Sequence, residues 1–186
     1  MIHHGDVRTI LPTLKAGSVQ CVVTSPPYWG LRNYNVKDQI GLERTPEAYV
    51  EKMVAVFREV KRVLRDDGTC WLNLGDSYAT GTVAPRGPTE ISGPSVPASW
   101  AGRSQPERCG TPVGLKTKDL VGMPWRLAFA LQADGWYLRS DIIWHKPNPM
   151  PESVTDRPTK SHEYLFLLTK SARYYYDADA VREPYA

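Results

Sequence analysis

Two short apolar runs on either side of a helical pattern constrain the fold of this chain more than any other feature. Val19–Thr24 is a β-branched run with apolar residues on both faces, which predicts a strand buried in a parallel sheet. Apolar residues then recur at three- and four-residue spacing over Pro46–Leu64, after Thr45 as a helix N-cap. Thr69–Leu74 has the composition of a second buried strand. The order strand, helix, strand predicts a βαβ unit in an open α/β sheet.

Further elements are predicted in the C-terminal part of the chain. Asp119–Ala133 has the pattern of a helix with Asp119 as its N-cap, and Gly135 suits the cap position at its C-terminus. Tyr137–His145 and Tyr164–Thr169 have the composition of strands. Because only a short turn separates the second of these from Arg173–Asp177, a hairpin is expected at the edge of the sheet.

Residues 80–117 interrupt this order. Six prolines and six glycines fall within these 38 positions, and apolar periodicity is almost absent. Such a segment is typical of a long loop or a disordered insert, and long loops within compact domains are usually functional or unstructured.

Composition excludes several classes of protein. No apolar run approaches the ~18 residues of a membrane span, and the N-terminus lacks the layout of a signal peptide, so a cytoplasmic protein without membrane association is expected. Cys21, Cys70 and Cys109 are odd in number and widely spaced, which predicts neither a zinc site nor a disulfide framework. The net charge of +3 is compatible with a phosphate-rich partner without requiring one.

The residues that follow the first strand carry the most specific chemistry. Ligands of open α/β sheets lie beyond the carboxyl ends of the strands, where this chain has Ser-Pro-Pro-Tyr-Trp. The hydroxyl of Ser25 and the carbonyl of Pro26 are suitable acceptors for the two N–H bonds of an exocyclic amino group. Tyr28 and Trp29 are suited to stack against a base swung out of a duplex. Taken alone, the tetrapeptide also fits a simple turn or polyproline segment, with Trp29 in the core.

Several segments together resemble bacterial and phage DNA amino-methyltransferases. Ser18–Tyr34 is similar to the catalytic motif of that family, and His4–Asp6 is similar to the Gly-Asp segment that commonly precedes it. Leu72–Tyr78 resembles the next strand and loop of the family, and Ile143–Tyr164 resembles a further characteristic string. These segments cover nearly the whole chain outside the 80–117 insert.

The resemblance implies a fold and a set of site residues. The expected fold is α/β, a partial Rossmann-like S-adenosylmethionine-dependent methyltransferase sheet with a C-terminal β-hairpin. The implied catalytic residues are Ser25, Pro26, Pro27 and Tyr28. Asp6 and Asp76 are expected beside the cofactor, S-adenosyl-L-methionine, and no metal is implied. The residues expected near the flipped base or the DNA backbone are Trp29, Lys146, Arg157, Lys160 and His162, although the three cations among them would suit a solvated loop equally well.

One signature of the family is missing from the sequence. A Phe-x-Gly-x-Gly turn that cradles S-adenosylmethionine is not found, and in this subgroup the catalytic segment comes first and the cofactor segment last. Residues 1–186 are therefore interpreted as the catalytic part of a methyltransferase domain without its cofactor-motif half. Either the sequence is truncated, which we favour, or a second polypeptide supplies the remaining strands. Little activity is expected of this chain alone.

The resemblance also indicates the reaction. Ser at the first motif position is associated mainly with cytosine N4, and Asp or Asn with adenine N6, so N4 methylation of double-stranded DNA with base flipping is preferred and N6 methylation is the alternative. A cognate restriction endonuclease is a possible partner. A DNA-binding remnant without activity is a different class of interpretation, and an RNA or protein substrate fits the motifs less well.

Overall fold

The computed structural model of the protein describes residues 2–79 and 114–183, so most of the predicted 80–117 insert lies outside the described residues. The elements in chain order are α1 (Val7–Ile10), the 3₁₀ helix η1 (Leu11–Thr13), β1 (Val19–Thr24), α2 (Pro46–Val63), β2 (Leu64–Leu74), α3 (Met123–Ala133), β3 (Tyr137–His145) and β4 (His162–Thr169). The chain forms two compact units, which are described separately. The first comprises Met1–Pro26, Val50–Gly75 and Pro124–Ala186, and the second comprises Pro27–Tyr49 and Asp76–Met123.

The first unit contains a four-stranded sheet in the order β1-β2-β4-β3. β1 and β2 are parallel, which confirms the predicted βαβ unit, and β4 is antiparallel to both of its neighbours. β2 begins at Leu64 rather than at Thr69, because Leu64 already pairs with Val19 of β1. The predicted burial of β1 is wrong for the described part of the chain: β2 is its one strand neighbour there, and Val23 is 77% exposed.

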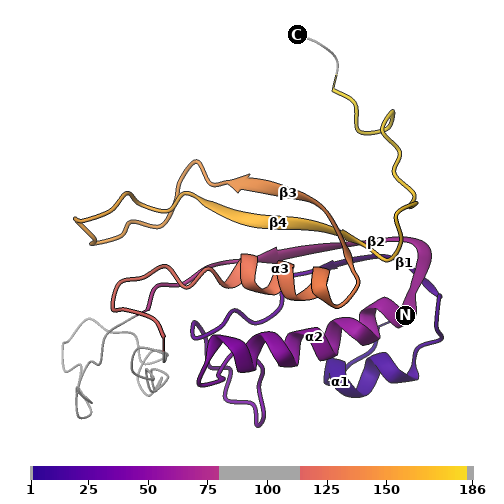
Figure 1. Ribbon diagram of the computed structural model, residues 1–186, viewed down its shortest axis with the longest axis horizontal. Coiled ribbons are helices and arrows are strands. Elements are labelled where there is room, and N and C mark those ends of the chain that lie inside the picture. Colours follow the sequence, from indigo (N-terminus) through magenta and orange to yellow (C-terminus); the bar gives the residue numbers. More distant parts are fainter. Residues whose placement is uncertain (1, 80–113, 184–186) are drawn as a thin grey trace. The chain divides into compact units, whose positions relative to one another are not determined.

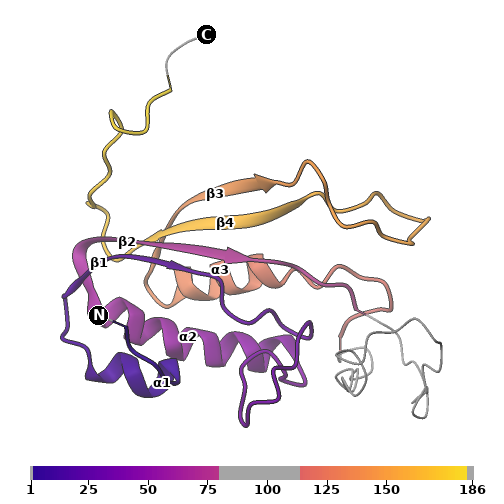
Figure 2. The ribbon, with the colours of Figure 1, turned by 180° about the vertical axis from the view of Figure 1, so that it is seen from behind.

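Both long helices of the first unit lie on the same side of this sheet, as the two opposite views show (Figures 1 and 2). The strand residues buried on that side include Cys70, Leu72 and Leu74, whereas the alternating residues Trp71 and Asn73 are only partly buried. This alternation follows from the pleat, which directs successive side chains to opposite faces. Within the described residues of this unit, the opposite face of the sheet therefore carries side chains that no helix covers.

Helix α2 forms where the sequence predicted it, apart from its last residue. The Thr45 hydroxyl oxygen accepts a hydrogen bond from the backbone N–H of Ala48 at 3.2 Å, as expected of an N-cap. The predicted apolar stripe is buried except for the partly exposed Val56, and Phe57 packs edge-on against Trp136 with ring centroids 6.2 Å apart. Among the described residues, no helix combines the length and the apolar character needed to cross a bilayer.

The start of the second long helix was predicted wrongly. α3 begins at Met123, not at Asp119, and its first N–H donates to the Asp76 carboxylate at 3.0 Å. The Asp119 carboxylate instead accepts a hydrogen bond from the backbone of Lys116 at 3.0 Å, within the preceding turn. The predicted C-terminal cap is confirmed, because Gly135 has φ +90° and the N–H of the next residue closes the helix end on Leu131.

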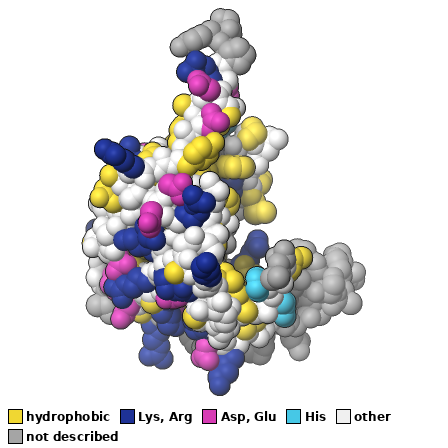
Figure 3. Space-filling view, turned by 90° about the vertical axis from the view of Figure 1, so that its right-hand side faces the viewer, with side chains coloured by type: hydrophobic (Ala, Val, Ile, Leu, Met, Phe, Trp, Pro, Cys, Tyr) yellow, Lys and Arg dark blue, Asp and Glu magenta, His cyan; other side chains and the backbone are white. Residues whose placement is uncertain are grey.

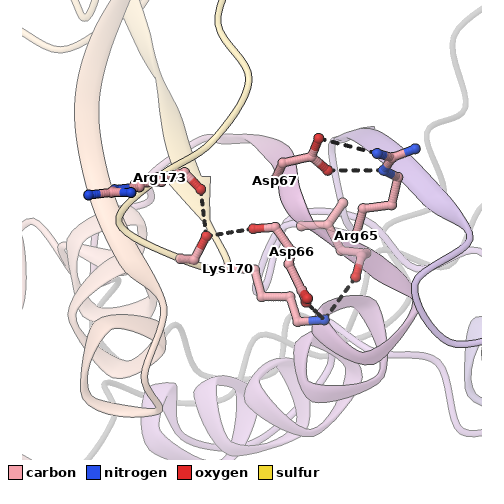
Figure 4. Close-up of polar contacts among 7 residues, drawn as sticks. Arg65, Asp66, Asp67, Lys170 and Arg173 are labelled. Carbon is pink, nitrogen blue, oxygen red and sulfur yellow. Dashed lines mark hydrogen bonds and ion pairs between the residues drawn. The ribbon is translucent and has the colours of Figure 1, made fainter.

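The predicted hairpin between Tyr164–Thr169 and Arg173–Asp177 is wrong. β4 pairs with β3, so that the antiparallel pair forms the edge of the sheet, and Arg173–Asp177 is not a strand. The chain after β4 is instead attached to the start of β2. Lys170 Nζ contacts the Asp66 carboxylate at 2.8 Å (Figure 4). Further along, the Tyr175 N–H donates to the Asp67 carbonyl at 2.9 Å. Because β4 already has β2 on one side and β3 on the other, Arg173–Asp177 cannot pair with it.

Truncation of Phe57 tests whether α2 is held by the burial described above. Phe57→Ala removes a fully packed ring, and we expect a loss of about 3–5 kcal/mol in the free energy of unfolding, measured by urea denaturation. Glu51→Ala, on the exposed side of the same helix, is the matched control and should change stability by less than about 0.5 kcal/mol. Equal effects of the two substitutions would contradict the packing described.

Candidate active site

The Ser-Pro-Pro-Tyr motif begins where β1 ends. Thr24, the last residue of β1, pairs with Leu72, so Ser25 leaves the sheet at the carboxyl end of two parallel strands. This is the position expected of a ligand site in an α/β sheet. Ser25 and Pro26 belong to the first unit, while Pro27 and Tyr28 belong to the second.

In the first unit, Ser25 is joined by hydrogen bonds to the neighbouring strands. Its hydroxyl donates to Oδ1 of Asn73 at 3.3 Å, and Nδ2 of Asn73 donates to the backbone carbonyl of Tyr164 at 3.1 Å. Ser25 is exposed, whereas Asn73 is partly buried in β2. The sequence analysis did not single out Asn73, although a polar residue within an otherwise apolar strand was a visible signal.

A shallow hollow of about 520 Å³ adjoins this hydrogen-bonded group on the uncovered face of the sheet. Its lining is mostly apolar and comes from all four strands: Val23, Trp71, Asn73, Trp144, Glu163 and Leu165. Since Asn73 both lines the hollow and bonds to Ser25, the Ser25 hydroxyl stands at its margin. The first unit thus combines an aromatic surface with a polar group at one edge.

In the second unit, the rest of the motif is held by the loop that follows it. The buried Tyr49 hydroxyl donates to the Pro27 carbonyl at 2.9 Å. Burial raises the pKa of Tyr49, and the negative charge of Glu43 raises it further, so this hydroxyl stays protonated as a donor. Gly41 has φ +104°, and a Cβ added there would lie 3.1 Å from the Tyr28 carbonyl. Tyr49 and Gly41 therefore fix the backbone after the two prolines.

Trp29 is tied to the same loop. Its indole N–H donates to the Glu43 carbonyl at 2.9 Å, and the Glu43 carboxylate in turn accepts from the backbone of Gly41 at 2.9 Å. The Trp29 side chain is partly buried. These contacts give Trp29 a structural role in the loop, and its predicted stacking on a base stays a prediction.

The two carboxylates expected beside the cofactor both bind nearby backbone. Asp6 caps α1 by accepting from the N–H of Arg8 at 2.8 Å, and the Arg8 guanidinium bonded to it lowers the pKa of Asp6 to about 2. Asp76 accepts from the N–H groups of Ser77 and Met123 at 2.9 and 3.0 Å. Asp6 lies in the first unit and Asp76 in the second. Their cofactor roles stay predictions.

The cations predicted to contact DNA are engaged within the chain. Lys146 forms an ion pair with Glu163, and Arg157 forms one with Glu152 at 2.7 Å, which lowers the pKa of that carboxyl group. On the face seen in Figure 3, Lys and Arg side chains lie among acidic ones. A phosphate contact by Lys146 or Arg157 would therefore have to compete with a carboxylate already present.

Lys160 and His162 lie against one aromatic ring. Lys160 Nζ stands 5.7 Å from the centre of the Tyr164 ring, and the His162 ring meets the same ring edge-on at 5.3 Å. Tyr164 is also the residue whose carbonyl binds Asn73. The structure thus brings these two predicted DNA contacts close to the Ser25 group through Tyr164, and their role on DNA stays a prediction.

Comparison with solved structures shows the fold. PvuII DNA methyltransferase, described as cytosine-N4-specific, superposes with a TM-score of 0.64 at 18% identity, over 95% of this chain and 51% of that one. A putative DNA modification methylase of Thermus thermophilus, solved in complex with S-adenosyl-L-methionine, gives a TM-score of 0.58 at 21% identity, over 95% of this chain and 55% of that one. The predicted methyltransferase-like α/β fold is confirmed.

Comparison of sequences is more specific. Type II methyltransferase M.XycI of Xanthomonas campestris pv. cyanopsidis is 59% identical over 183 residues, which is 98% of this chain and 58% of the relative. Type II methyltransferase M.Cfr9I of Citrobacter freundii is 57% identical over 182 residues, again 98% and 58%. This chain thus spans less than two thirds of the length of these relatives. Residues 19–186 also match the sequence profile of a DNA methylase family. The chain belongs to this family, the DNA amino-methyltransferases that its motifs predicted.

Proposed function

We propose that the protein transfers a methyl group from S-adenosyl-L-methionine to the N4 amino group of a cytosine flipped out of double-stranded DNA. The observation that carries this proposal is the exposed Ser25 hydroxyl at the carboxyl end of β1, at the margin of an aromatic-lined hollow. Ser at this motif position favours cytosine N4 over adenine N6. The cytosine-N4 specificity of PvuII methyltransferase agrees with that choice, although at 18% identity the likeness itself shows the fold alone.

The chain contributes hydrogen-bond acceptors to this reaction. An amino nitrogen conjugated to a base ring is a poor nucleophile, because its lone pair is delocalised. If the Ser25 hydroxyl oxygen and the Pro26 carbonyl each accept one N–H bond, the nitrogen becomes pyramidal and its lone pair is directed away from both acceptors. The Tyr28 ring stacks on the base and holds it in that orientation. Alignment of the reacting atoms then supplies much of the rate.

The cofactor, when bound, would supply the electrophilic methyl group: as the N–C bond forms, the C–S bond breaks to leave a neutral thioether, and the amino nitrogen releases one of its two protons to water. The part of its site that this chain offers is incomplete, because the sequence has no Phe-x-Gly-x-Gly turn. In the described part of the first unit, β1 has one strand neighbour and one face of the sheet is uncovered, with Val23 and Trp144 77% and 59% exposed. These features support the proposal that polypeptide outside residues 1–186 completes the cofactor pocket, and that Asp6 and Asp76 contribute to its rim.

The DNA contacts follow from the same proposal. On DNA, Lys146 and Arg157 would each exchange a carboxylate partner for a backbone phosphate. These contacts would place the hollow beside the duplex, with Lys160 and His162 close to the flipped base. The type II names of the relatives support a role in restriction-modification. We propose a cognate restriction endonuclease as partner and a cytoplasmic location as parts of the same function.

Removal of an acceptor or of the stacking ring tests the catalytic motif. In the complete enzyme, we expect Ser25→Ala to lower kcat roughly 10²- to 10³-fold, as for the loss of one hydrogen bond made in a transition state. Tyr28→Ala should reduce the stabilisation of the transition state by about 1–3 kcal/mol, which is the contribution of base stacking. Turnover is measured by transfer of labelled methyl groups to duplex DNA. Unchanged turnover of both variants would overturn the proposed function.

The identity of the modified base is tested separately. DNA treated with the complete enzyme is digested to nucleosides, which are identified by mass spectrometry. N4-methylcytosine is expected because Ser occupies position 25. Untreated DNA from a methylation-deficient host serves as the control. Detection of N6-methyladenine in place of N4-methylcytosine would end the cytosine assignment and leave the amino-methyltransferase reaction in place.

The incomplete cofactor pocket predicts how residues 1–186 behave alone. Titration of S-adenosylmethionine against the purified chain should show no saturable binding at micromolar concentration, and no methyl transfer to DNA. The complete enzyme, titrated in parallel, provides the matched control. Methyl transfer by the 186-residue chain alone would show that it holds a full cofactor site.

A further inference from the structure

Asn73 determines whether Ser25 donates or accepts the hydrogen bond between their side chains. A backbone carbonyl can only accept hydrogen bonds, so the Tyr164 carbonyl at 3.1 Å requires the NH₂ end of the Asn73 amide to face it. The oxygen end, Oδ1, must then face Ser25 at 3.3 Å. The amide of Asn73 is thereby held in one orientation by β4, the strand next to its own.

The orientation of Asn73 decides what Ser25 offers to a substrate. The contact between these two oxygens at 3.3 Å is a hydrogen bond only with a proton between them, and the Asn73 oxygen carries none. That proton is therefore the single hydroxyl proton of Ser25. Once it is directed at Asn73, the Ser25 oxygen can only accept from any further partner, which is the role that an amino group requires. The separation is longer than a typical hydroxyl hydrogen bond, as is common in catalytic groups before substrate binds.

We propose that Asn73 is a positioning and selecting residue for the methyl transfer: its amide oxygen accepts a hydrogen bond from residue 25 and so requires a hydrogen-bond donor at that position. Ser meets this requirement, and so does Asn, whose NH₂ can face Asn73 while its carbonyl faces the base. Asp does not meet it, because an ionised carboxylate has only acceptors to place against Oδ1 of Asn73. The inference rests on the proposed function of Ser25 as an acceptor, and it adds a reason for the residue found there.

The position of Asn73 agrees with this role. It lies in β2, which is bonded to β1 on one side and to β4 on the other, so Tyr164 is held within the sheet and Ser25 directly follows the last residue of β1. Its side chain lies on the face that the helices do not cover and lines the hollow beside Ser25. Asn73 is not an acid or base at neutral pH, so its effect is confined to orienting the hydroxyl.

A double-mutant cycle in the complete enzyme tests the inference, with Ser25→Asn and Ser25→Asp as a nearly isosteric pair. With Asn73 present, we expect kcat of Ser25→Asn to exceed that of Ser25→Asp by at least about tenfold, since two acceptors facing each other lose a hydrogen bond and repel. In the Asn73→Ala background the two should differ by less than about twofold, because the partner that distinguishes them is gone.

The controls separate this role from a structural one. Leu165→Ala changes the cross-strand partner of Asn73 in the same hollow without removing the amide, so the ratio between Ser25→Asn and Ser25→Asp should persist in that background. Thermal unfolding of every variant checks that the enzyme is folded, and the loss in Asn73→Ala should fall on kcat rather than on KM for DNA.

Two outcomes overturn the inference: equal kcat values for Ser25→Asn and Ser25→Asp with Asn73 present, or an unchanged ratio between them after Asn73→Ala. Either result leaves the proposed function intact if Ser25→Ala still lowers kcat roughly 10²- to 10³-fold. Full turnover by both Ser25→Ala and Tyr28→Ala has a different meaning, because it removes the proposed function and the inference with it.

Discussion

The parallel pairing of β1 with β2 is the constraint on which the candidate site depends. Thr24 lies opposite Leu72, and this register brings the residue that follows β1 beside Asn73. A shift of one residue would turn Asn73 toward the helices and move an apolar side chain next to Ser25. The buried residues of β2, which include Leu72 and Leu74, prevent such a shift because they pack on the helical side. Ordinary core packing thus sets the geometry of the polar group.

The sheet also explains why the hydrogen bonds of Ser25 and Asn73 lie on the uncovered side. The helices of the first unit cover one face, and the pleat sends Trp71 and Asn73 to the other, together with Leu165 of β4. The hydrogen bonds from Ser25 to Asn73 and from Asn73 to Tyr164 run along this face, across three adjacent strands. A rigid sheet supports this group well, since Asn73 and Tyr164 are held by the backbone ladder and Ser25 directly follows the last paired residue of β1.

Local patterns in the sequence predicted what is local in the structure. The bounds of β1, the N-cap Thr45 and the cap glycine Gly135 followed from residue type and spacing, because each depends on neighbours within a few positions. Motif resemblance predicted the family and the Ser25 position. The capping of α3 by Asp76 was missed, because the two lie far apart in the chain and no periodicity links them.

Contacts between distant segments account for the other differences. The second strand of the hairpin was misplaced because a short turn suggested a local partner, whereas β4 pairs with the more distant β3. Asn73 and Tyr49 were not identified as site residues, since their roles depend on a hydroxyl and a carbonyl that only the fold brings near. A polar residue inside an apolar strand was the one signal available for Asn73.

The most direct measurement is a crystal structure of the complete enzyme with duplex DNA that contains its target base and with a non-reactive analogue of the cofactor. The account predicts the flipped amino nitrogen within hydrogen-bond distance of both the Ser25 hydroxyl oxygen and the Pro26 carbonyl, with the Ser25 proton still directed at Asn73 Oδ1. An amino group held by other residues, with Ser25 turned away from it, would contradict the account.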